Sequence, residues 1–387
     1  MDLIKTGGCG SNMKVDWLIV GAGFTGATLA ERIANGLDQK VLVVEGRNHI
    51  GGNAYDCYDE QGILIHKYGS HTFHTNSKLV WDYLSRFTQW RPYFHEVRAS
   101  VDGMKIPLPF NLNALSALFS PQYAQKLSSL LIRQYGFGAK IPILKLREHA
   151  NEDLGFLADF IYQKVFHRYT IKHWDLKPEE LDQSVSARVP VYVSRDNRYF
   201  QDTYQGIPLH GFTAMFNRML NHPNIKLLLN TDYQEIADEI RYKRMIYTGP
   251  IDAFFGYKHG HLPYRSLRFH FETHQKEWYQ EVGTVNYPNE YDFTRILEQK
   301  HLTGQVSPHT TISFVYPQPY TPGENEPYYP IPRKENSQRY SLYKQEAEQI
   351  RDRVLFAGRL ADYQYYNMDQ AVARALTLFK QMVEEPL

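Results

Sequence analysis

The chain has 387 residues, enough for a large buried core and two or three domains. Its 43 Lys and Arg balance 42 Asp and Glu, and a formal net charge of +1 argues against general binding to nucleic acid or to a membrane surface. No apolar run reaches the roughly 18 residues of a membrane span, and no apolar signal core stands at the N-terminus. The two cysteines, Cys9 and Cys57, are too few for a disulfide framework or a thiolate metal site. A cytoplasmic protein without nucleic-acid or membrane partners is therefore expected.

The N-terminal part of the chain predicts a strand, a helix and a second strand in succession. Residues 1–13 are polar and are predicted to be a disordered extension. The apolar run 15–20 is short enough for a buried parallel strand. Residues 24–36 show helical spacing and are predicted to stop at Gly36, a typical helix C-cap. A second apolar run, 41–45, predicts the next parallel strand and completes the start of a dinucleotide-binding fold.

The turn between the first strand and the helix carries the pattern G-x-G-x-x-G, at Gly21, Gly23 and Gly26. Glycines let the backbone approach a pyrophosphate, and the helix N-terminus offers unpaired N–H groups and the positive end of a dipole. Glu45, at the end of the second strand, can accept hydrogen bonds from ribose hydroxyls, which favours an unphosphorylated ribose over NADP. Because strand, glycines, helix and acid occur in this order, the pattern is specific for a dinucleotide site.

Two further segments favour FAD over NAD as the dinucleotide. Arg47 and the glycine pair Gly51–Gly52 follow the second strand and suit a second close approach of the backbone to the cofactor. Residues 353–360 predict a late strand, and a helix is predicted from about Asn367. A late strand-to-helix junction packed on the first domain is typical of FAD proteins that close over the flavin.

The chain between these ends changes from helical to strand-like patterns. Residues 77–87 predict a helix, and 95–110 predict a hairpin around Asp102–Gly103. Helical spacing dominates from 111 to 182, and strand-like runs return after 225. The expected fold is α/β, with a Rossmann-like FAD-binding domain, a helical insertion domain and an antiparallel β-sheet domain. The expected boundaries are 14–90 with 206–250 and 350–387 for the FAD-binding domain, 110–205 for the helical domain, and 91–109 with 251–349 for the sheet domain.

Tyrosine is abundant, with 29 residues, and arginines recur near tyrosines in the second half of the chain. Taken singly, each of these residues is typically a surface or structural residue. Together they suit a diphosphate pocket, because arginine binds phosphate through a planar fork and tyrosine adds neutral donors. The sequence shows no convincing Ser/His/Asp or Cys/His arrangement for nucleophilic catalysis.

These features occur together in one known family. In order, the chain carries GAGF, HIGGN, YG-x-H-x-FHT, YTIK-x-W, DNRYF, GPIDAFFGY, YYPI, GRLA and NMD. With these motifs it resembles bacterial UDP-galactopyranose mutase from about residue 15 to 382. The resemblance implies an FAD-dependent isomerase, or intramolecular transferase, that interconverts UDP-galactopyranose and UDP-galactofuranose with no net redox change. It implies that the flavin is active when reduced, with its N5 acting as the nucleophile on the anomeric carbon. An external electron donor, a homo-oligomer and a supply of galactofuranose to cell-surface polysaccharides are also implied.

Residue roles follow from the matching motifs. Arg188 and Arg295 would neutralise the diphosphate and His71 would lie against the flavin, so these three are expected to be catalytic. The segment 189–201 resembles the mobile lid of the family. Further substrate-binding positions are expected at Phe166, Tyr169, Thr170, Trp174, Tyr199, Asn286, Tyr329, Tyr365, His95 and Asn367. Cofactor-binding positions are expected at Gly21, Gly23, Phe24, Gly26, Glu45, Gly46, Arg47, Gly52, Asn53, His71, Gly358, Arg359, Tyr366, Asn367 and Met368.

Some positions depart from the family pattern or invite another interpretation. No metal is expected, because no carboxylate or third ligand is visible near His74, for which packing is the favoured role. The departures leave the sugar preference open. They are Ser70 where the family usually has Pro, Val165 where many members have Phe, His95 where several have Asn, Asn367 where many have Asp, and residues 167–169 (HRY) where a Gly-containing form is more usual.

Three alternative functions stay open. A related mutase would act on another UDP-sugar, such as an N-acetylated or pentose sugar. An FAD oxidoreductase of the amine-oxidase type would share the Rossmann frame, but it needs an aromatic cage for a neutral amine, and Arg188 and Arg295 argue against it. A nucleotide-sugar-binding protein without chemistry would bind UDP and show no turnover that depends on a reductant.

Overall fold

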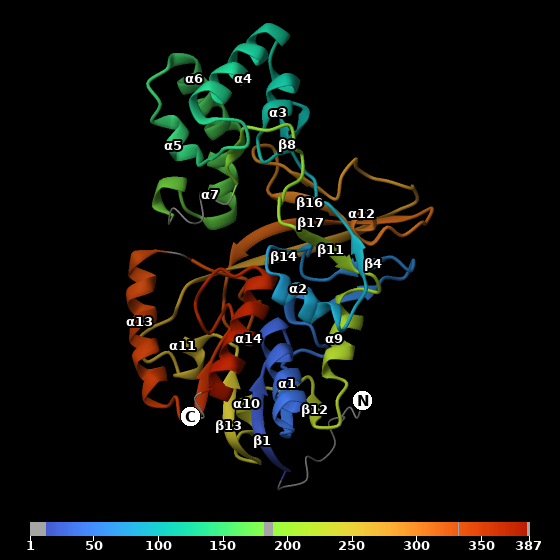
Figure 1. Cartoon of the computed structure of the whole chain (residues 1–387), viewed down its shortest axis with the longest axis vertical. Coiled ribbons are helices and arrows are strands. Elements are labelled where there is room, and N and C mark those ends of the chain that lie inside the picture. Colours follow the sequence, from blue (N-terminus) through green and yellow to red (C-terminus); the bar gives the residue numbers. More distant parts are fainter. Residues whose placement is uncertain (1–12, 182–188, 332, 385–387) are drawn as a thin grey trace.

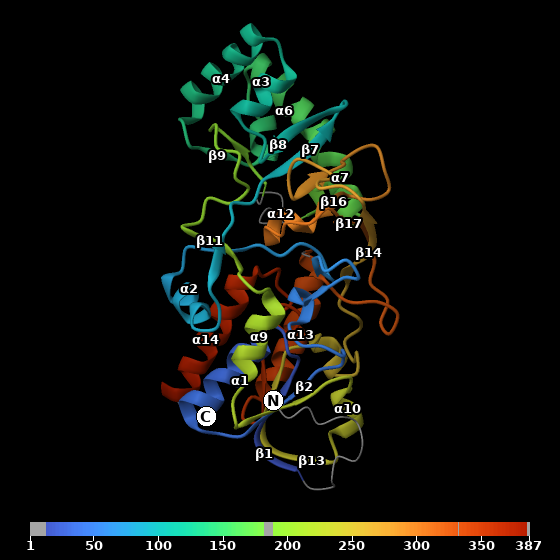
Figure 2. The ribbon, with the colours of Figure 1, turned by 90° about the vertical axis from the view of Figure 1, so that its right-hand side faces the viewer.

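The computed structural model describes residues 13–181, 189–331 and 333–384. Three regions follow one another along the long axis of the molecule, with a parallel sheet at one end, an antiparallel sheet in the middle and a group of helices at the other end (Figure 1). The view after a quarter turn shows the same order, with the helices above the edge of the antiparallel sheet (Figure 2). This arrangement agrees with the α/β fold expected from the sequence.

The parallel sheet is the Rossmann-like part of the molecule. Its strands, in spatial order, are β12 (Ile225–Leu228), β2 (Val41–Val44), β1 (Met13–Val20), β13 (Ile240–Tyr247) and β19 (Val354–Phe356). All four neighbouring pairs are parallel. Met13, which the sequence assigned to the disordered extension, opens β1 because it pairs with Ile240. The remainder of that expectation, residues 1–12, lies outside the described residues.

Helices cover both faces of the parallel sheet, as continuous apolar strands require. One face packs on helices through a core that includes Ile19, Val43 and Ile246. The other face buries Leu18, Leu42 and their neighbours. The helices on the first face are α1 (Phe24–Leu37), α2 (Lys78–Ser85), α9 (Phe212–Leu220) and α14 (Met368–Glu384), and residues of α10 (Tyr233–Ile236) and α11 (Ile251–Phe254) pack on the second, with α13 (Lys334–Gln349) beyond them.

Helix α1 does not stop at Gly36, so the sequence-based C-cap was wrong. The helix continues to Leu37, and Asp38 adopts the left-handed conformation that ends it. Gly36 has a packing role instead. A Cβ there would lie 2.8 Å from the ring of Phe379 on α14, so the absent side chain allows the two helices to cross closely. Gly26 is equally constrained, because its Cβ would lie 1.9 Å from the carbonyl oxygen of Gly21.

The central sheet has seven strands and is largely antiparallel. The predicted hairpin is present, with Asp102 and Gly103 both at positive φ in its turn. The pairing of β15 with β7 is the parallel exception. In spatial order the strands are β18 (Tyr329–Pro330), β14 (Tyr264–His274), β17 (Thr310–Pro319), β16 (Arg295–Glu298), β15 (Thr284–Asn286), β7 (Val97–Val101) and β8 (Met104–Leu108).

The helical region surrounds its own apolar core, which includes Leu115, Leu127 and Leu157. Helix α6 runs through the π-helical segment η2 directly into α7. The wider π turn is often found at functional sites. The helices are α3 (Leu112–Leu118), α4 (Pro121–Tyr135), α5 (Ile143–Arg147), α6 (Glu152–Ile161), η2 (Tyr162–His167), α7 (Arg168–Trp174) and η3 (Pro178–Glu180).

Short elements connect the three regions. A three-stranded sheet brings a strand from each of three chain segments together beside α2. The hairpin of β3 and β4 leads into the predicted His71 turn. The remaining elements are β5 (Phe73–Thr75), β11 (Tyr204–Pro208) and β6 (Trp90–Pro92) in that sheet, then η1 (Gly52–Ala54), β3 (Asp56–Tyr58), β4 (Leu64–His66), β9 (Lys140–Ile141), β10 (Val191–Tyr192) and α12 (Gln299–Thr303).

Candidate active site

A cavity of about 840 Å³ lies at the carboxyl ends of the parallel strands. This is where open α/β sheets bind their ligands. Its wall contains Val20, Val44 and Tyr247, the last residues of three neighbouring strands, and residues 231–234, which follow a fourth. All the expected cofactor positions line the cavity except Tyr366. The ring of Tyr366 lies instead beside Asp362 and Arg374, and its pKa is raised to about 12, chiefly by burial.

Neither the backbone conformation nor the packing of the glycine loop explains why position 23 is glycine. Gly23, at the N-cap of α1, has φ −78°, a conformation open to any residue. A Cβ on Gly23 would meet nothing closer than the Cα of Gly52, at 3.9 Å. The protein therefore does not itself require glycine here. A ligand pressed against the N-terminus of α1 does, which fits the pyrophosphate of a dinucleotide.

Glu45 holds the loops around the cavity together. One carboxylate oxygen accepts from the backbone N–H of Ala22 at 2.9 Å, and the other accepts from the N–H of Arg47 at 3.0 Å. Each oxygen has a second lone pair, so hydrogen bonds from ribose hydroxyls remain compatible with these contacts. Glu45 thus connects the glycine loop to the segment after β2.

Arg47 supplies a charged group on the cavity wall. Its Nη2 donates to Asn53 Oδ1 at 2.9 Å and to Glu326 Oε2 at 2.7 Å, and its guanidinium lies 4.3 Å from the ring centre of Tyr68. Burial opposes the charge, but Glu326 and Tyr68 keep the pKa of Arg47 above its ordinary value. Nη1 is buried and has no hydrogen-bond partner among the described residues. An acceptor group on a bound cofactor would satisfy it.

His71 lines the same cavity from a turn closed by two hydrogen bonds. Its Nδ1 lies 2.6 Å from the carbonyl oxygen of Gly69, and its backbone N–H donates to His66 Nδ1 at 3.0 Å. Burial, with the charges of Arg359 and Arg295 and the ring of His66 as further causes, lowers the pKa of His71 to about 3. The ring is therefore neutral near pH 7. Its proton sits on Nδ1, because a carbonyl can only accept, so Nε2 is an acceptor.

Arg295 is the centre of a second cluster, on the antiparallel sheet. It opens β16 opposite Asn286 of β15, and its Nη1 is 3.4 Å from the hydroxyl of Tyr169 on α7. Burial opposes its charge, but Tyr169, Tyr329 and Tyr365 hold the pKa of Arg295 above the ordinary value. Five residues that the sequence assigned to substrate thus converge from β15, β16, β18, α7 and the segment before α14.

Aromatic rings form the wall beside Arg295. The ring of Tyr329 lies 6.0 Å from Trp174 and 5.0 Å from Tyr365, nearly edge to face with the latter. The guanidinium of Arg359 lies 5.6 Å from the ring centre of Tyr365. Since Arg359 also lines the cofactor cavity, it joins the two halves of the site.

Other expected substrate residues are placed less uniformly. His95 is buried, and burial, with His74, Arg295 and His301 as further causes, lowers its pKa to about 3. Tyr199 reaches it through its backbone N–H, which donates to the carbonyl of His95 at 2.7 Å. Phe166 packs against the core of the helical region, and Thr170 lies on α7 with Tyr169. Asn367 and Met368 line the cofactor cavity. Arg188 lies outside the described residues.

No carboxylate near His74 was expected from the sequence, and the structure corrects this. Its Nδ1 lies 2.9 Å from Oδ2 of Asp202, and its ring stacks on Phe200 with centroids 3.6 Å apart. Asp202 is far away in the sequence, so spacing alone could not reveal it. The pair holds β5 to the segment before β11. Among residues 13–181, 189–331 and 333–384, no group of three or more His, Cys, Asp or Glu could hold a metal ion.

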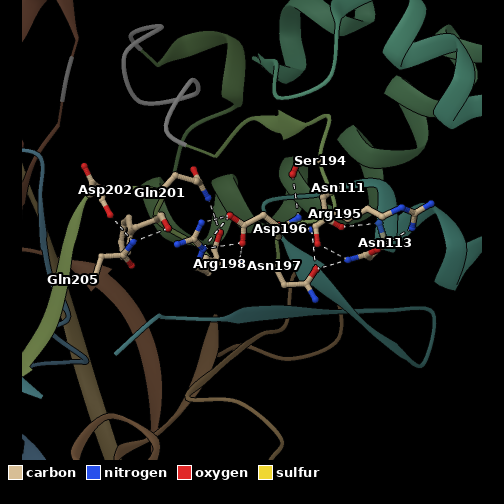
Figure 3. A network of polar contacts seen from close by, with 11 residues as sticks. Asn111, Asn113, Ser194, Arg195, Asp196, Asn197, Arg198, Gln201, Asp202 and Gln205 are labelled. Atoms are coloured by element: carbon tan, nitrogen blue, oxygen red, sulfur yellow. Dashed lines mark hydrogen bonds and ion pairs between the residues drawn. The ribbon is translucent and has the colours of Figure 1, made fainter. Parts of the chain in front are cut away.

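The segment expected to be a lid, 189–201, is linked to the start of α3 (Figure 3). Asn111 donates to the carbonyl of Asp196 and Asn113 donates to that of Arg195, each at 2.9 Å. The side chain of Arg198 pairs with Asp196 at 2.7 Å. The two arginines of the segment thus bind neighbouring polar groups in this conformation, and mobility of the segment stays a prediction.

The sequence missed one side of the cofactor cavity. Residues 231–234, 247–250 and 326–328 line it, and none was assigned to the cofactor, although Gly249, Pro250 and Tyr328 fall within the motifs GPIDAFFGY and YYPI. Two of these segments follow strands of the parallel sheet, so the correct strand order would have indicated them. Tyr328 is deeply buried, and burial raises its pKa above the ordinary range.

The fold and the cavity define a protein of the Rossmann dinucleotide-binding class. Residues 19–87 match the family model of an NAD(P)-binding Rossmann-like domain. Residues 164–365, more than half of the chain, match the model "GLF: UDP-galactopyranose mutase". The chain therefore belongs to the UDP-galactopyranose mutase family, a family of flavoprotein mutases. No helix in the described part of the chain is long and apolar enough to cross a membrane.

Curated relatives match over nearly the whole length. A probable UDP-galactopyranose mutase of Klebsiella pneumoniae is 34% identical over 93% of this chain and 92% of its own. The UDP-galactopyranose mutase of Mycoplasma genitalium is 34% identical over 98% of both chains. A dTDP-fucopyranose mutase of Escherichia coli is 32% identical over 93% of this chain and 96% of its own.

Solved structures show the same fold at lower identity. A reduced UDP-galactopyranose mutase superposes with a TM-score of 0.72 at 16% identity, over 96% of each chain. A putative protoporphyrinogen oxidase from Exiguobacterium gives 0.62 at 13% identity, over 98% of this chain and all of that one. The frame is thus shared with oxidases, and the site must distinguish the activities.

Proposed function

We propose that the protein binds FAD in the cavity at the ends of the parallel strands and interconverts UDP-galactopyranose and UDP-galactofuranose. The observation that carries this proposal is the contact between the cofactor cavity and the Arg295 cluster. His71 lines the cavity, and Arg295 lies near enough to contribute to its low pKa. A sugar held by Arg295 through its diphosphate would therefore lie beside the cofactor.

The cavity fits FAD by the features of its own residues. Gly23 leaves a space at the N-terminus of α1 that a side chain would fill, and Arg47 presents a buried Nη1 without a protein partner. Glu45 can accept from a ribose. When bound and reduced, the flavin supplies the nucleophile for the anomeric carbon of the sugar.

The Arg295 cluster would bind the diphosphate as it leaves the sugar and returns to it. Arg295 is partly buried, so water screens its attraction for a phosphate less than at an exposed position. Hydroxyls of Tyr169, Tyr329 and Tyr365 surround it and can donate to the remaining phosphate oxygens. Since negative charge grows on the diphosphate as the bond breaks, these donors stabilise the transition state more than the bound substrate.

His71 and the aromatic wall would position the sugar and exclude water. With its proton on Nδ1, His71 offers Nε2 as an acceptor to a hydroxyl or N–H in the cavity. The rings of Trp174, Tyr329 and Tyr365 contact one another and would shield a bound diphosphate from bulk solvent. A site that returns the diphosphate to the same sugar benefits from such shielding, because water would compete for the sugar.

A second candidate is a mutase for another nucleotide sugar. The E. coli relative that is 32% identical is named for dTDP-fucopyranose, which differs in both base and sugar. His95, which is buried and lies near enough to Arg295 and His74 for both to affect its pKa, is the residue that we associate with such a preference. FAD oxidoreductase activity is disfavoured by the positive charge of Arg295, which is partly buried and lies near the cofactor cavity.

The purified protein, loaded with FAD, should be incubated with UDP-galactofuranose, with and without dithionite, and the products separated by chromatography. We expect UDP-galactopyranose to form only after reduction. Turnover without reductant would contradict the flavin role. If the reduced enzyme converts a dTDP-deoxysugar and leaves UDP-galactofuranose unchanged, the second candidate replaces the first.

A further inference from the structure

Lys172 makes an unusual set of contacts just beside the nucleotide-sugar site. Its ammonium group donates to three backbone carbonyls, of Tyr287 at 2.6 Å, Tyr291 at 2.8 Å and Phe293 at 3.2 Å. All three belong to one loop, 287–294, and Lys172 itself belongs to α7. Three oxygens use all three donors of the lysine, so the group acts as a fixed cross-link rather than a surface charge.

The loop and the helix each carry a part of the proposed site. The loop joins β15, which ends at Asn286, to β16, which begins at Arg295. Helix α7 carries Tyr169 and Trp174. The distance between these groups depends on how the helix docks on the sheet. A direct contact across the junction, from Arg295 to Tyr169, is long at 3.4 Å, so other contacts must hold the two elements in place.

Contacts within the loop fix its shape, so that its carbonyl oxygens are held in place for Lys172. The N–H of Tyr287 donates to the carbonyl of Thr294 at 2.8 Å and closes the loop at its base. Inside it, the rings of Tyr291 and Phe293 stack with centroids 4.7 Å apart. Asn289 adds a second link to the helical region, because its Nδ2 donates to the carbonyl of Lys164 at 2.8 Å.

From these contacts we infer that Lys172 is a positioning residue for the nucleotide-sugar site, setting the distance between the Tyr169 helix and the Arg295 strand. This inference rests on the proposed function, which assigns both elements to one substrate. Lys172 would touch neither the substrate nor the cofactor. Its effect would be on affinity for the nucleotide, because a loosened helix no longer presents its rings in register with the arginine.

The charge state of Lys172 provides a test of the inference, because a positioning role predicts that the affinity for UDP depends on pH. Burial lowers the pKa of Lys172 to about 8, with Arg168 acting in the same direction and Glu290 and Asp292 opposing. In the mildly alkaline range the ammonium group loses a proton, and the lysine then has two hydrogen-bond donors instead of three. An arginine keeps its charge throughout this range.

The test uses UDP itself as the probe and isothermal titration calorimetry on the FAD-loaded protein. At pH 7 we expect Lys172→Met to raise the Kd for UDP at least ~10-fold with the FAD spectrum unchanged, since charged hydrogen bonds that hold a site are lost. Lys164→Met is the matched control, because its ammonium pairs with Asp102 at the surface, at 2.7 Å. We expect the Kd of the control to stay within about 2-fold of the wild type, as surface ion pairs contribute little.

A pH series separates positioning from general destabilisation. We expect the Kd of the wild type for UDP to rise between pH 7 and pH 9, and that of Lys172→Arg to stay constant. Equal affinity of Lys172→Met and wild type, or a flat wild-type profile, would overturn the inference while the proposed function stands. Absence of UDP binding by the wild type would overturn both.

Discussion

Asn286 and Arg295 lie directly opposite each other on the antiparallel strands β15 and β16. Residues opposed in this way project from the same face of a sheet. The amide of Asn286 is buried, and its Oδ1 has no hydrogen-bond partner among the described residues. The strand pairing therefore places an acceptor that no described residue satisfies next to a partly buried cation, a combination suited to the hydroxyl and phosphate groups of a nucleotide.

Replacing Arg295 should separate cofactor binding from turnover. We expect Arg295→Ala to keep the yellow FAD spectrum and lose at least ~100-fold in mutase turnover, because a few kcal/mol of charged hydrogen bonding is removed. Arg295→Lys should retain only part of the wild-type turnover, since lysine cannot bind two phosphate oxygens through a planar fork. Arg268→Ala, an exposed arginine on β14, is the control. Wild-type turnover in Arg295→Ala would exclude the diphosphate role.

A side chain at Gly23 should expel the cofactor without unfolding the protein. A Cβ at Gly23 would lie 3.9 Å from the nearest protein atom, so the protein itself has space for it. The same Cβ would stand in the loop that would face the pyrophosphate, and there it would exclude the cofactor. We expect a colourless protein with a normal circular dichroism spectrum. Gly155→Ala, on α6 and also 3.9 Å from its nearest atom, should remain yellow. Stoichiometric FAD in Gly23→Val would show that the pyrophosphate binds elsewhere.

His71 should act without titrating in the neutral range. Its pKa is lowered to about 3, primarily by burial, so it stays neutral from pH 5 to pH 8. We therefore expect His71→Gln to keep the shape of the wild-type pH–rate profile in this range. Turnover should fall about 10- to 100-fold, because a positioned acceptor is lost. A limb near pH 6.5 that vanishes in the variant would contradict the neutral assignment. A stopped-flow or chromatographic assay over this range suffices.

Four histidines, three of them buried and His71 partly exposed at the cavity, should make the fold sensitive to acid. Burial is the main cause that lowers the pKa of His66 to about 4 and the pKa values of His71, His95 and His173 to about 3. Between these values and about 6.5 the unfolded chain binds more protons, so the free energy of unfolding falls as pH falls. Each histidine contributes up to about 1.4 kcal/mol per pH unit in that window.

Thermal unfolding followed between pH 7 and pH 4.5 tests this linkage. We expect the Tm to decline below about pH 6. His173→Gln should make the decline shallower, because one of the buried titrating groups is removed, and His270→Gln on the surface of β14 controls for loss of an imidazole. An unchanged slope in His173→Gln would argue against the contribution of that residue.

The sequence predicted local features well and long-range contacts poorly, for physical reasons. The glycine turn, the hairpin at Asp102–Gly103 and the helix before the C-terminus depend on residues near one another in the chain, and all three are present. The family motifs also indicated Arg295 and its tyrosines. The link between His74 and Asp202 depends on tertiary pairing that no local pattern encodes. The three bonds of Lys172 went unnoticed because backbone carbonyls have no signature in a sequence.

The parallel sheet takes its strands from widely separated parts of the chain, with β2 and β1 from the start, β12 and β13 from the middle and β19 near the end. During synthesis, the glycine loop leaves the ribosome long before residues 358–371, which line the same cavity. The nascent chain must hold an incomplete sheet while two other regions are made, and such non-local pairing folds slowly. A cofactor can therefore stabilise the folded state through the complete cavity only after the last strand and the segment that follows it have been made.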